Sequence, residues 1–140
     1  MSKPRAKWWG YVRQVLYAYP RMCDELSQRR ADAVRLTPSY GQQGGGSPGS
    51  HGSHGSPVER AALVTLPPTE QRELDAVEAA IQVNRAMKDG ALRLELIRLV
   101  FWKRDHTLAG AALKLHISYS TARRRQNEFI REVGRNMGLT

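Results

Sequence analysis

The sequence has one cysteine, Cys23. A single thiol cannot form a disulfide within the chain, and the paired cysteines of a zinc ribbon are absent as well. Since disulfides accumulate in oxidising compartments, this composition favours a reducing cytoplasm. Cys23 lies on the apolar face of a predicted helix, where we expect a buried and unreactive thiol.

Long apolar runs are also absent. The most apolar stretch, residues 92–102, is interrupted by charged side chains and is far too short to span a bilayer. Near the N-terminus, Arg13 and Gln14 interrupt the stretch from Trp8 to Tyr19, so this segment does not resemble a signal peptide. We therefore expect no membrane partner.

The groups that catalysis requires do not converge. Acidic residues in the middle of the chain lie along the start of one predicted helix, where they complement the helix dipole: Glu70, Glu73, Asp75 and Glu78. They do not stand at metal-ligand spacing from a histidine. The glycines at 44–46 lack the lysine of a phosphate-binding loop, and His51 and His54 have no carboxylate or cysteine nearby. We expect no enzymatic activity, no cofactor and no bound metal.

Positive charge is what the chain has in excess. Lysine and arginine number 22 against 13 acidic residues, giving a net charge of +9 and favouring a polyanionic partner. Residues 1–36 carry eight basic and three acidic side chains, a net of +5, and residues 91–140 carry ten and four, a net of +6. Residues 37–90 carry four and six, a net of −2. A polyanion would therefore meet the C-terminal part, with the N-terminal part as a second contact.

Apolar residues recur every three or four positions, and no stretch alternates as a strand does, so the sequence predicts an all-α fold. Residues 1–36 form an N-terminal helical segment, in which Pro20 either kinks one helix or begins a second. Residues 37–56 are a Gly/Ser-rich linker with little to bury, and we expect disorder there. Residues 57–140 form a helical domain.

Three helices are expected in the first half of that domain. Residues 56–59, Ser-Pro-Val-Glu, have the sequence of a capping box and begin a short helix that ends near residue 64. A longer helix spans about 68–88 and is stopped by Asp89 and Gly90. Another spans about 91–103, with Leu92, Leu96, Leu99, Val100, Phe101 and Trp102 on its inner side.

Residues 107–135 have the spacing of a helix-turn-helix. Thr107 caps a first helix, Ala112 is small where a second helix crosses, and Ser118 caps that second helix. Ile117 is the apolar plug between the two. His116 occupies the turn position at which glycine, which tolerates positive φ, is usual.

In such a motif the second helix enters the major groove of double-stranded DNA with its first residues at the base edges. Arg125 lies nearer the core flank, as a phosphate clamp or a structural partner. The candidate DNA-binding residues are Thr107, Ser118, Tyr119, Ser120, Arg123, Arg124, Arg125 and Asn127. Two other interpretations stay open: a basic helical hairpin with solvated arginines, and RNA binding.

The stretch TLAGAALKLHISYSTARRR resembles region 4 of sigma-70-type factors, with the pattern T-x-x-x-x-A-x-x-L-x-I-S-x-x-T running from Thr107 to Thr121. The whole-chain layout resembles the RinA/ArpU-type phage transcriptional regulators, through the segments KWWGYVRQVLYAYPRM, SPVERAAL and LRLELIRLVFWKRDH before the motif. This resemblance implies an activator of late phage or prophage genes that binds upstream promoter DNA at the nucleoid of a bacterial host.

This interpretation implies further partners, and two alternative functions stay open. The N-terminal helices would contact bacterial RNA polymerase or form a homodimer, since two half-sites on DNA require a dimer. Arg29, Arg30 and Arg35 form a basic cluster that is either a solvated face or a second phosphate contact. The main rival is a small terminase-like subunit that recognises DNA for packaging as a ring. A third alternative is a membrane-associated or scaffolding helical protein whose charge is incidental.

Overall fold

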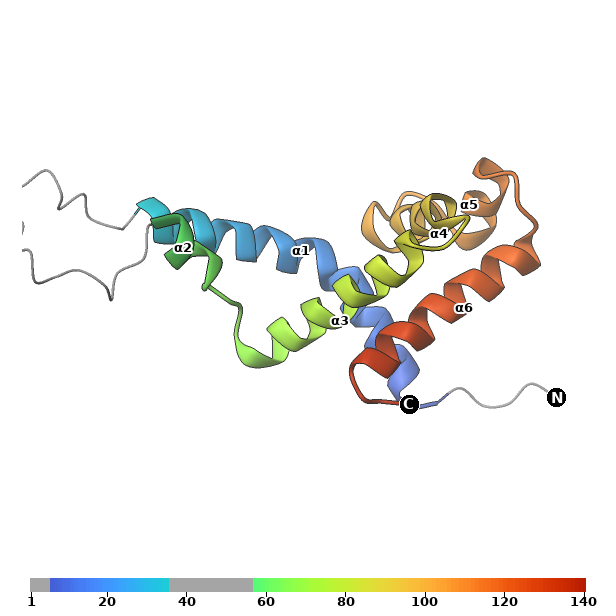
Figure 1. Ribbon diagram of the computed structural model, residues 1–140. Helices are drawn as coiled ribbons and strands as arrows, with labels where there is room; N and C mark the ends of the chain where they lie inside the picture. Colours follow the sequence, from blue (N-terminus) through green and yellow to red (C-terminus); the bar gives the residue numbers. More distant parts are fainter. Residues whose placement is uncertain (1–5, 36–56) are drawn as a thin grey trace, which may run out of the picture.

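The computed structural model describes residues 6–35 and 57–140. Of these residues 79% are helical and none is in a strand, which confirms the predicted all-α fold. The elements are α1 (Trp8–Arg35), α2 (Pro57–Ala62), α3 (Pro68–Arg85), α4 (Gly90–Ile97), η3 (Arg98–Trp102), α5 (Leu108–Lys114) and α6 (Tyr119–Asn136) (Figure 1). The predicted linker and Ser56 of the expected capping box lie outside the described residues.

The N-terminal segment is one helix, with Pro20 inside α1. Proline there removes one backbone hydrogen bond, so the helix depends on the packing of its apolar face. Val12, Leu16, Met22 and Leu26 on that face are buried. Residues 8–35 therefore do not divide into two helices at the proline.

The main core lies where α1, α3 and α6 cross (Figure 1). Leu16 from α1, Val77 from α3 and Ile130 from α6 are fully buried in it. Trp102 packs at its edge between Tyr19, with ring centroids 5.1 Å apart, and Phe129, at 6.3 Å. Because α1 shares this core, it forms one packed unit with the helices after residue 56.

A second, smaller core joins α4 and η3 to the α5–α6 pair. Its buried members are Leu96, Leu99, Ala111, Ala112 and Ala122. The three alanines come from α5 and α6, and their small side chains allow the two helix backbones to approach closely. The predicted small residue at 112 therefore has the expected place in the packing.

The helix predicted over 91–103 is interrupted by a π-helical turn. The backbone N–H of Lys103 donates to the carbonyl of Arg98, five residues earlier, at 2.7 Å, which is the π pattern. The wider turn shifts the inner face, so Ile97, Leu99 and Phe101 are buried. Val100 and Trp102 are half-buried and pack against the core, as predicted. Leu92 is also half-buried but packs against neither core, so its predicted inward position was wrong.

The turn between α3 and α4 requires a glycine. The predicted helix over 68–88 ends earlier, at Arg85, and residues 86–89 lead into α4. A Cβ added to Gly90 would lie 2.1 Å from the backbone oxygen of Asn84 and 3.0 Å from that of Arg85. Backbone atoms cannot move aside as a flexible side chain can, so any other residue would strain this junction.

We predict that Gly90→Ala lowers the free energy of unfolding by about 2–3 kcal/mol, because the helix junction must open to admit the methyl group. The control is Gly10→Ala in α1, where an added Cβ meets nothing within 4 Å. This control should raise the free energy of unfolding by up to about 1 kcal/mol. Urea denaturation measures both, and equal stability of the Gly90→Ala variant and the wild type would contradict the close approach.

Candidate nucleic-acid interface

Both predicted caps of the helix-turn-helix are present. The hydroxyl of Thr107 accepts a hydrogen bond from the backbone N–H of Gly110 at 3.0 Å and begins α5. The hydroxyl of Ser118 accepts from the backbone N–H of Thr121 at 3.1 Å and begins α6. Ser118 also donates to the Thr121 hydroxyl at 2.8 Å. These bonds satisfy helix N-terminal donors that would otherwise need water.

The turn between the helices is a Schellman motif with His116 in the left-handed region, at φ 58°. The N–H of Ile117 donates to the carbonyl of Ala112 at 3.0 Å, and the N–H of His116 donates to that of Leu113 at 3.2 Å. Ile117 packs against the small core that contains Ala112. The turn therefore has the predicted geometry, with histidine where glycine is usual.

Several predicted DNA-binding residues lie exposed on the first half of α6. Tyr119 is 53% exposed, and Ser120 and Arg123 are exposed as well. The side chain of Arg124 is 63% exposed and lies 3.8 Å from Glu128. Asn127 is half-buried. Opposite them, Ala122, Gln126 and Phe129 face the core, so this helix is amphipathic.

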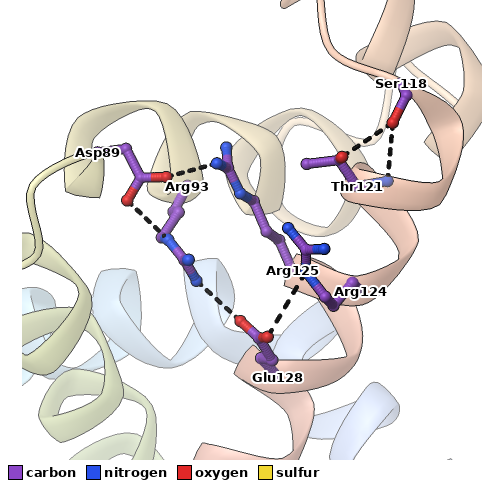
Figure 2. Close-up of polar contacts among 7 residues, drawn as sticks. All are labelled: Asp89, Arg93, Ser118, Thr121, Arg124, Arg125 and Glu128. Atoms are coloured by element: carbon purple, nitrogen blue, oxygen red, sulfur yellow. Dashed lines mark hydrogen bonds and ion pairs between the residues drawn. The ribbon is translucent and has the colours of Figure 1, made fainter.

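Arg125 lies on the other flank of α6, in an ion-pair network (Figure 2). Its guanidinium is 2.5 Å from a carboxylate oxygen of Asp89, and its side chain is only 16% exposed. Asp89 also accepts from Arg93 at 2.9 Å, and Arg93 reaches Glu128 at 2.9 Å. Of the two roles considered for Arg125, these contacts favour that of a structural partner, since it ties α6 to the start of α4.

The network holds Asp89 in its ionised form. A hydrogen bond from Arg93 is the main cause that lowers the pKa of Asp89, and the charges of Arg93 and Arg125 add to it. Charge-assisted bonds of this kind are stronger than neutral ones. The α3–α4 turn is thereby fixed to the helix that carries the candidate DNA-binding residues.

On the side of α6 that faces α1, the molecule has a cavity of about 610 Å³. Arg123 and Tyr119 of α6 line it together with Arg13 and Tyr17 of α1 and Arg104 before α5. Sequence reasoning missed Arg13 and Arg104. Arg104 is close to the motif along the chain, but only the packing of α1 against η3 and α6 brings Arg13 to the same place.

The basic cluster near the end of α1 lies elsewhere. In Figure 1 this end of α1, with α2 beside it, lies at the side of the molecule away from α5 and the start of α6. Arg29 pairs with Glu25 at 3.2 Å and Arg35 with Asp32 at 2.7 Å, both within the helix. Of the two interpretations considered, these positions favour a solvated face for Arg29, Arg30 and Arg35.

Cys23 is half-buried rather than fully buried. Burial raises the pKa of its thiol above the ordinary value, which keeps the thiol protonated. Across residues 6–35 and 57–140, histidine, cysteine and acidic side chains do not gather in threes as a metal site would need. Over the same residues, no helix combines the length and apolar character needed to cross a membrane.

Comparisons with family models, with curated proteins and with solved structures found no match to this chain. The resemblance to sigma-70 region 4 and to the RinA/ArpU-type regulators therefore stays an expectation that depends on the motif residues. Structural support for a function comes from the geometry of α5, the turn and α6 alone.

We predict that Asp89→Asn lowers the free energy of unfolding at neutral pH, because Arg125 then loses its ion-pair partner and two of its guanidinium nitrogens are already buried without acceptors in the described structure. The pKa of Asp89 in the folded protein lies below its ordinary value of 3.8. The contribution of the carboxylate is therefore complete above about pH 4 and is lost as the pH falls through that lower pKa.

Urea denaturation of the wild type and of the Asp89→Asn variant at several pH values measures this difference, which should narrow on acidification. Asp24→Asn is the control, because Asp24 is exposed and makes no ion pair with the described residues. A difference between wild type and Asp89→Asn that stays constant down to pH 2 would contradict an ionised Asp89 as its source.

At the turn, we predict that His116→Val lowers the free energy of unfolding by about 1–2 kcal/mol, since a β-branched residue is strained at positive φ. His116→Gly should keep or slightly raise it, because glycine adopts this conformation without strain but loses more entropy on folding. Both variants are compared by urea denaturation. If valine is tolerated as well as histidine, residue 116 is not held in the left-handed region.

Proposed function

We propose that the chain binds double-stranded DNA with sequence specificity, with α6 lying in the major groove. The observation that carries the proposal is the pair of side-chain caps around a Schellman turn, with polar and basic side chains exposed on the first half of α6. An α-helix fits the major groove of B-DNA, and in a helix-turn-helix its first turns approach the bases.

The exposed side chains fit this task in different ways. Arginine can donate two hydrogen bonds to guanine, so Arg124, which points away from the core, is the proposed base-reading residue. Ser120 and Asn127 lie beside it on the outer side of α6 and offer both donors and acceptors to base edges. The net charge of +9 supports attraction to the phosphate backbone on any DNA sequence.

The biological role is proposed on the resemblance to the RinA/ArpU-type regulators. The protein would be a phage or prophage regulator that activates late genes by binding promoter DNA, at the nucleoid of its bacterial host. A homodimer would read two half-sites, and contact with RNA polymerase would couple binding to transcription. Support for this role comes from the motif residues between Thr107 and Thr121 and from the order of the helices along the chain.

The direct test is selection of bound duplexes from a random library and from phage genomic DNA, at a stated salt concentration. The expected result is one enriched sequence, bound at least about a thousandfold more tightly than unrelated duplexes. Tight binding without enrichment would reduce the function to non-specific DNA binding. No binding to double-stranded DNA at low salt would overturn the proposal.

We predict that Arg124→Ala weakens binding to the selected sequence by about 1–3 kcal/mol and relaxes the preference at one base position. Arg135→Ala is the matched control. Both arginines lie on α6, are 63% and 65% exposed, and are paired with one glutamate each. Arg135 lies in the last turn, which the proposed docking leaves outside the groove, so its loss should have little effect.

Electrophoretic mobility shifts or fluorescence anisotropy on the selected duplex and its single-base variants measure these changes. Equal losses for Arg124→Ala and Arg135→Ala would show that the long-range charge of the helix matters and that Arg124 reads no base. An equal loss on every duplex would reassign Arg124 to the phosphate backbone.

A further inference from the structure

The cavity on the α1 side of α6 gathers positive charge from three separate parts of the chain. Arg13 comes from α1, Arg104 from the segment between η3 and α5, and Arg123 from α6. In the part of the chain that the structure describes, no acidic side chain lines the cavity, and none of these three arginines makes an ion pair. Their charges therefore repel one another, and an anion between them would relieve that repulsion.

The nearest acidic residue along the chain does not neutralise this charge. Asp105 follows Arg104 directly, but its two carboxylate oxygens are occupied by His106 Nδ1, at 2.6 Å, and by Lys103 Nζ, at 3.1 Å. Asp105 is therefore engaged by Lys103 and by His106, which itself lines the cavity, and the guanidinium of Arg104 keeps its donors for another partner.

Aromatic rings, rather than carboxylates, hold two of the arginines in place. Arg104 lies over the ring of Tyr17, 4.4 Å from its centroid, and Arg13 lies 5.4 Å from the ring centroid of Phe101. Arg13 also donates to the Tyr17 hydroxyl at 3.3 Å. A guanidinium stacked on a ring keeps most of its in-plane N–H donors, which is the arrangement that suits a phosphate.

The backbone of Arg104 is left-handed, directly after Lys103, the C-cap residue of η3. Arg104 has φ 58°, a left-handed conformation that costs free energy for any residue except glycine. Arginine stands at this position although glycine would relieve the strain. In this conformation the side chain of Arg104 lies over Tyr17 of α1 and lines the cavity.

We propose that this cavity is a phosphate site, in which Arg13, Arg104 and Arg123 contact a backbone phosphate of the DNA strand that passes along α6. The inference rests on the proposed function, since DNA supplies the phosphate. The position fits, because Tyr119 and Arg123 belong to the first turns of α6, which enter the groove, and the strand flanking a groove carries phosphates. A free phosphate compound has the same chemistry and forms a separate arm of the test.

The site makes α1 part of the DNA-binding surface. Arg13 lies far from the helix-turn-helix along the chain, yet it shares the cavity with Arg123. At about 610 Å³ the cavity is much larger than one phosphate group, so it has room for the adjoining sugar as well. Arg123 then contacts the backbone, while Arg124 next to it is left to read a base.

The test compares Arg13→Gln with Arg30→Gln. Each variant removes one positive charge from α1, but Arg30 is exposed, lies toward the other end of the helix and does not line the cavity. Affinity for the selected duplex and for an unrelated duplex is measured over a series of salt concentrations. Thermal unfolding of each variant, followed by circular dichroism, checks that it folds.

Arg13→Gln should weaken binding to both duplexes by about tenfold and lower the slope of log affinity against log salt by about one, as loss of a phosphate contact does. Arg30→Gln should change affinity less than about twofold and leave the slope unchanged. Arg13→Lys, which keeps the charge, should restore most of the slope. A wild-type slope for Arg13→Gln would overturn the phosphate site and leave the proposed function intact.

A second arm replaces DNA with inorganic pyrophosphate, compared with sodium chloride at equal ionic strength. Pyrophosphate should raise the unfolding temperature of the wild type and of Arg30→Gln, but not that of Arg13→Gln. This result in a protein that binds no DNA would support the phosphate site, assign it to a free phosphate compound and overturn the proposed function. If the wild type neither binds DNA nor gains thermal stability with pyrophosphate, both proposals are overturned.

Discussion

The burial of the inner face of α6 is the interaction on which the other features depend. The second half of this helix inserts Phe129, Ile130 and Val133 between α1 and α3, while Ala122 in its first half packs on α5. One rigid helix therefore belongs to both cores. The outer side of its first half, away from the main core, faces solvent. Because the anchored half and the exposed half are the same helix, the position of the exposed side chains is set by core packing and not by a flexible loop.

Local signals in the sequence were enough to predict the caps and the turn. Thr107 and Ser118 each bond to a backbone N–H only three residues away, so a short sequence pattern contains all the information that the geometry requires. The π-turn had no such signal, since the apolar pattern of residues 91–103 fits an ordinary α-helix. The partners of Arg125 and the place of Arg13 depend on tertiary packing, which one sequence without relatives does not reveal.

Two Schellman turns among the described residues illustrate why a missing glycine did not mislead the prediction. After α6, Gly138 at φ 75° occupies the same position as His116 after α5, and Leu139 bonds back to Gly134 as Ile117 does to Ala112. The hydrogen bonds and the apolar contact define the motif. The residue at positive φ determines only the conformational free energy that the turn costs, about 1–2 kcal/mol for a non-glycine residue. The small core under Ile117 offsets that cost.

The π-turn at η3 can also be regarded as one inserted residue in a regular helix. In an α-helix each residue advances by about 100°, so a chain one residue shorter between 98 and 102 would rotate α5 and the loop before it by that amount relative to α4. Arg104 would then leave the face of Tyr17, and α5 would start in another direction. Length in this segment is therefore more constrained than residue identity, and a homologue that keeps the motif but loses one residue here would present a differently oriented binding surface.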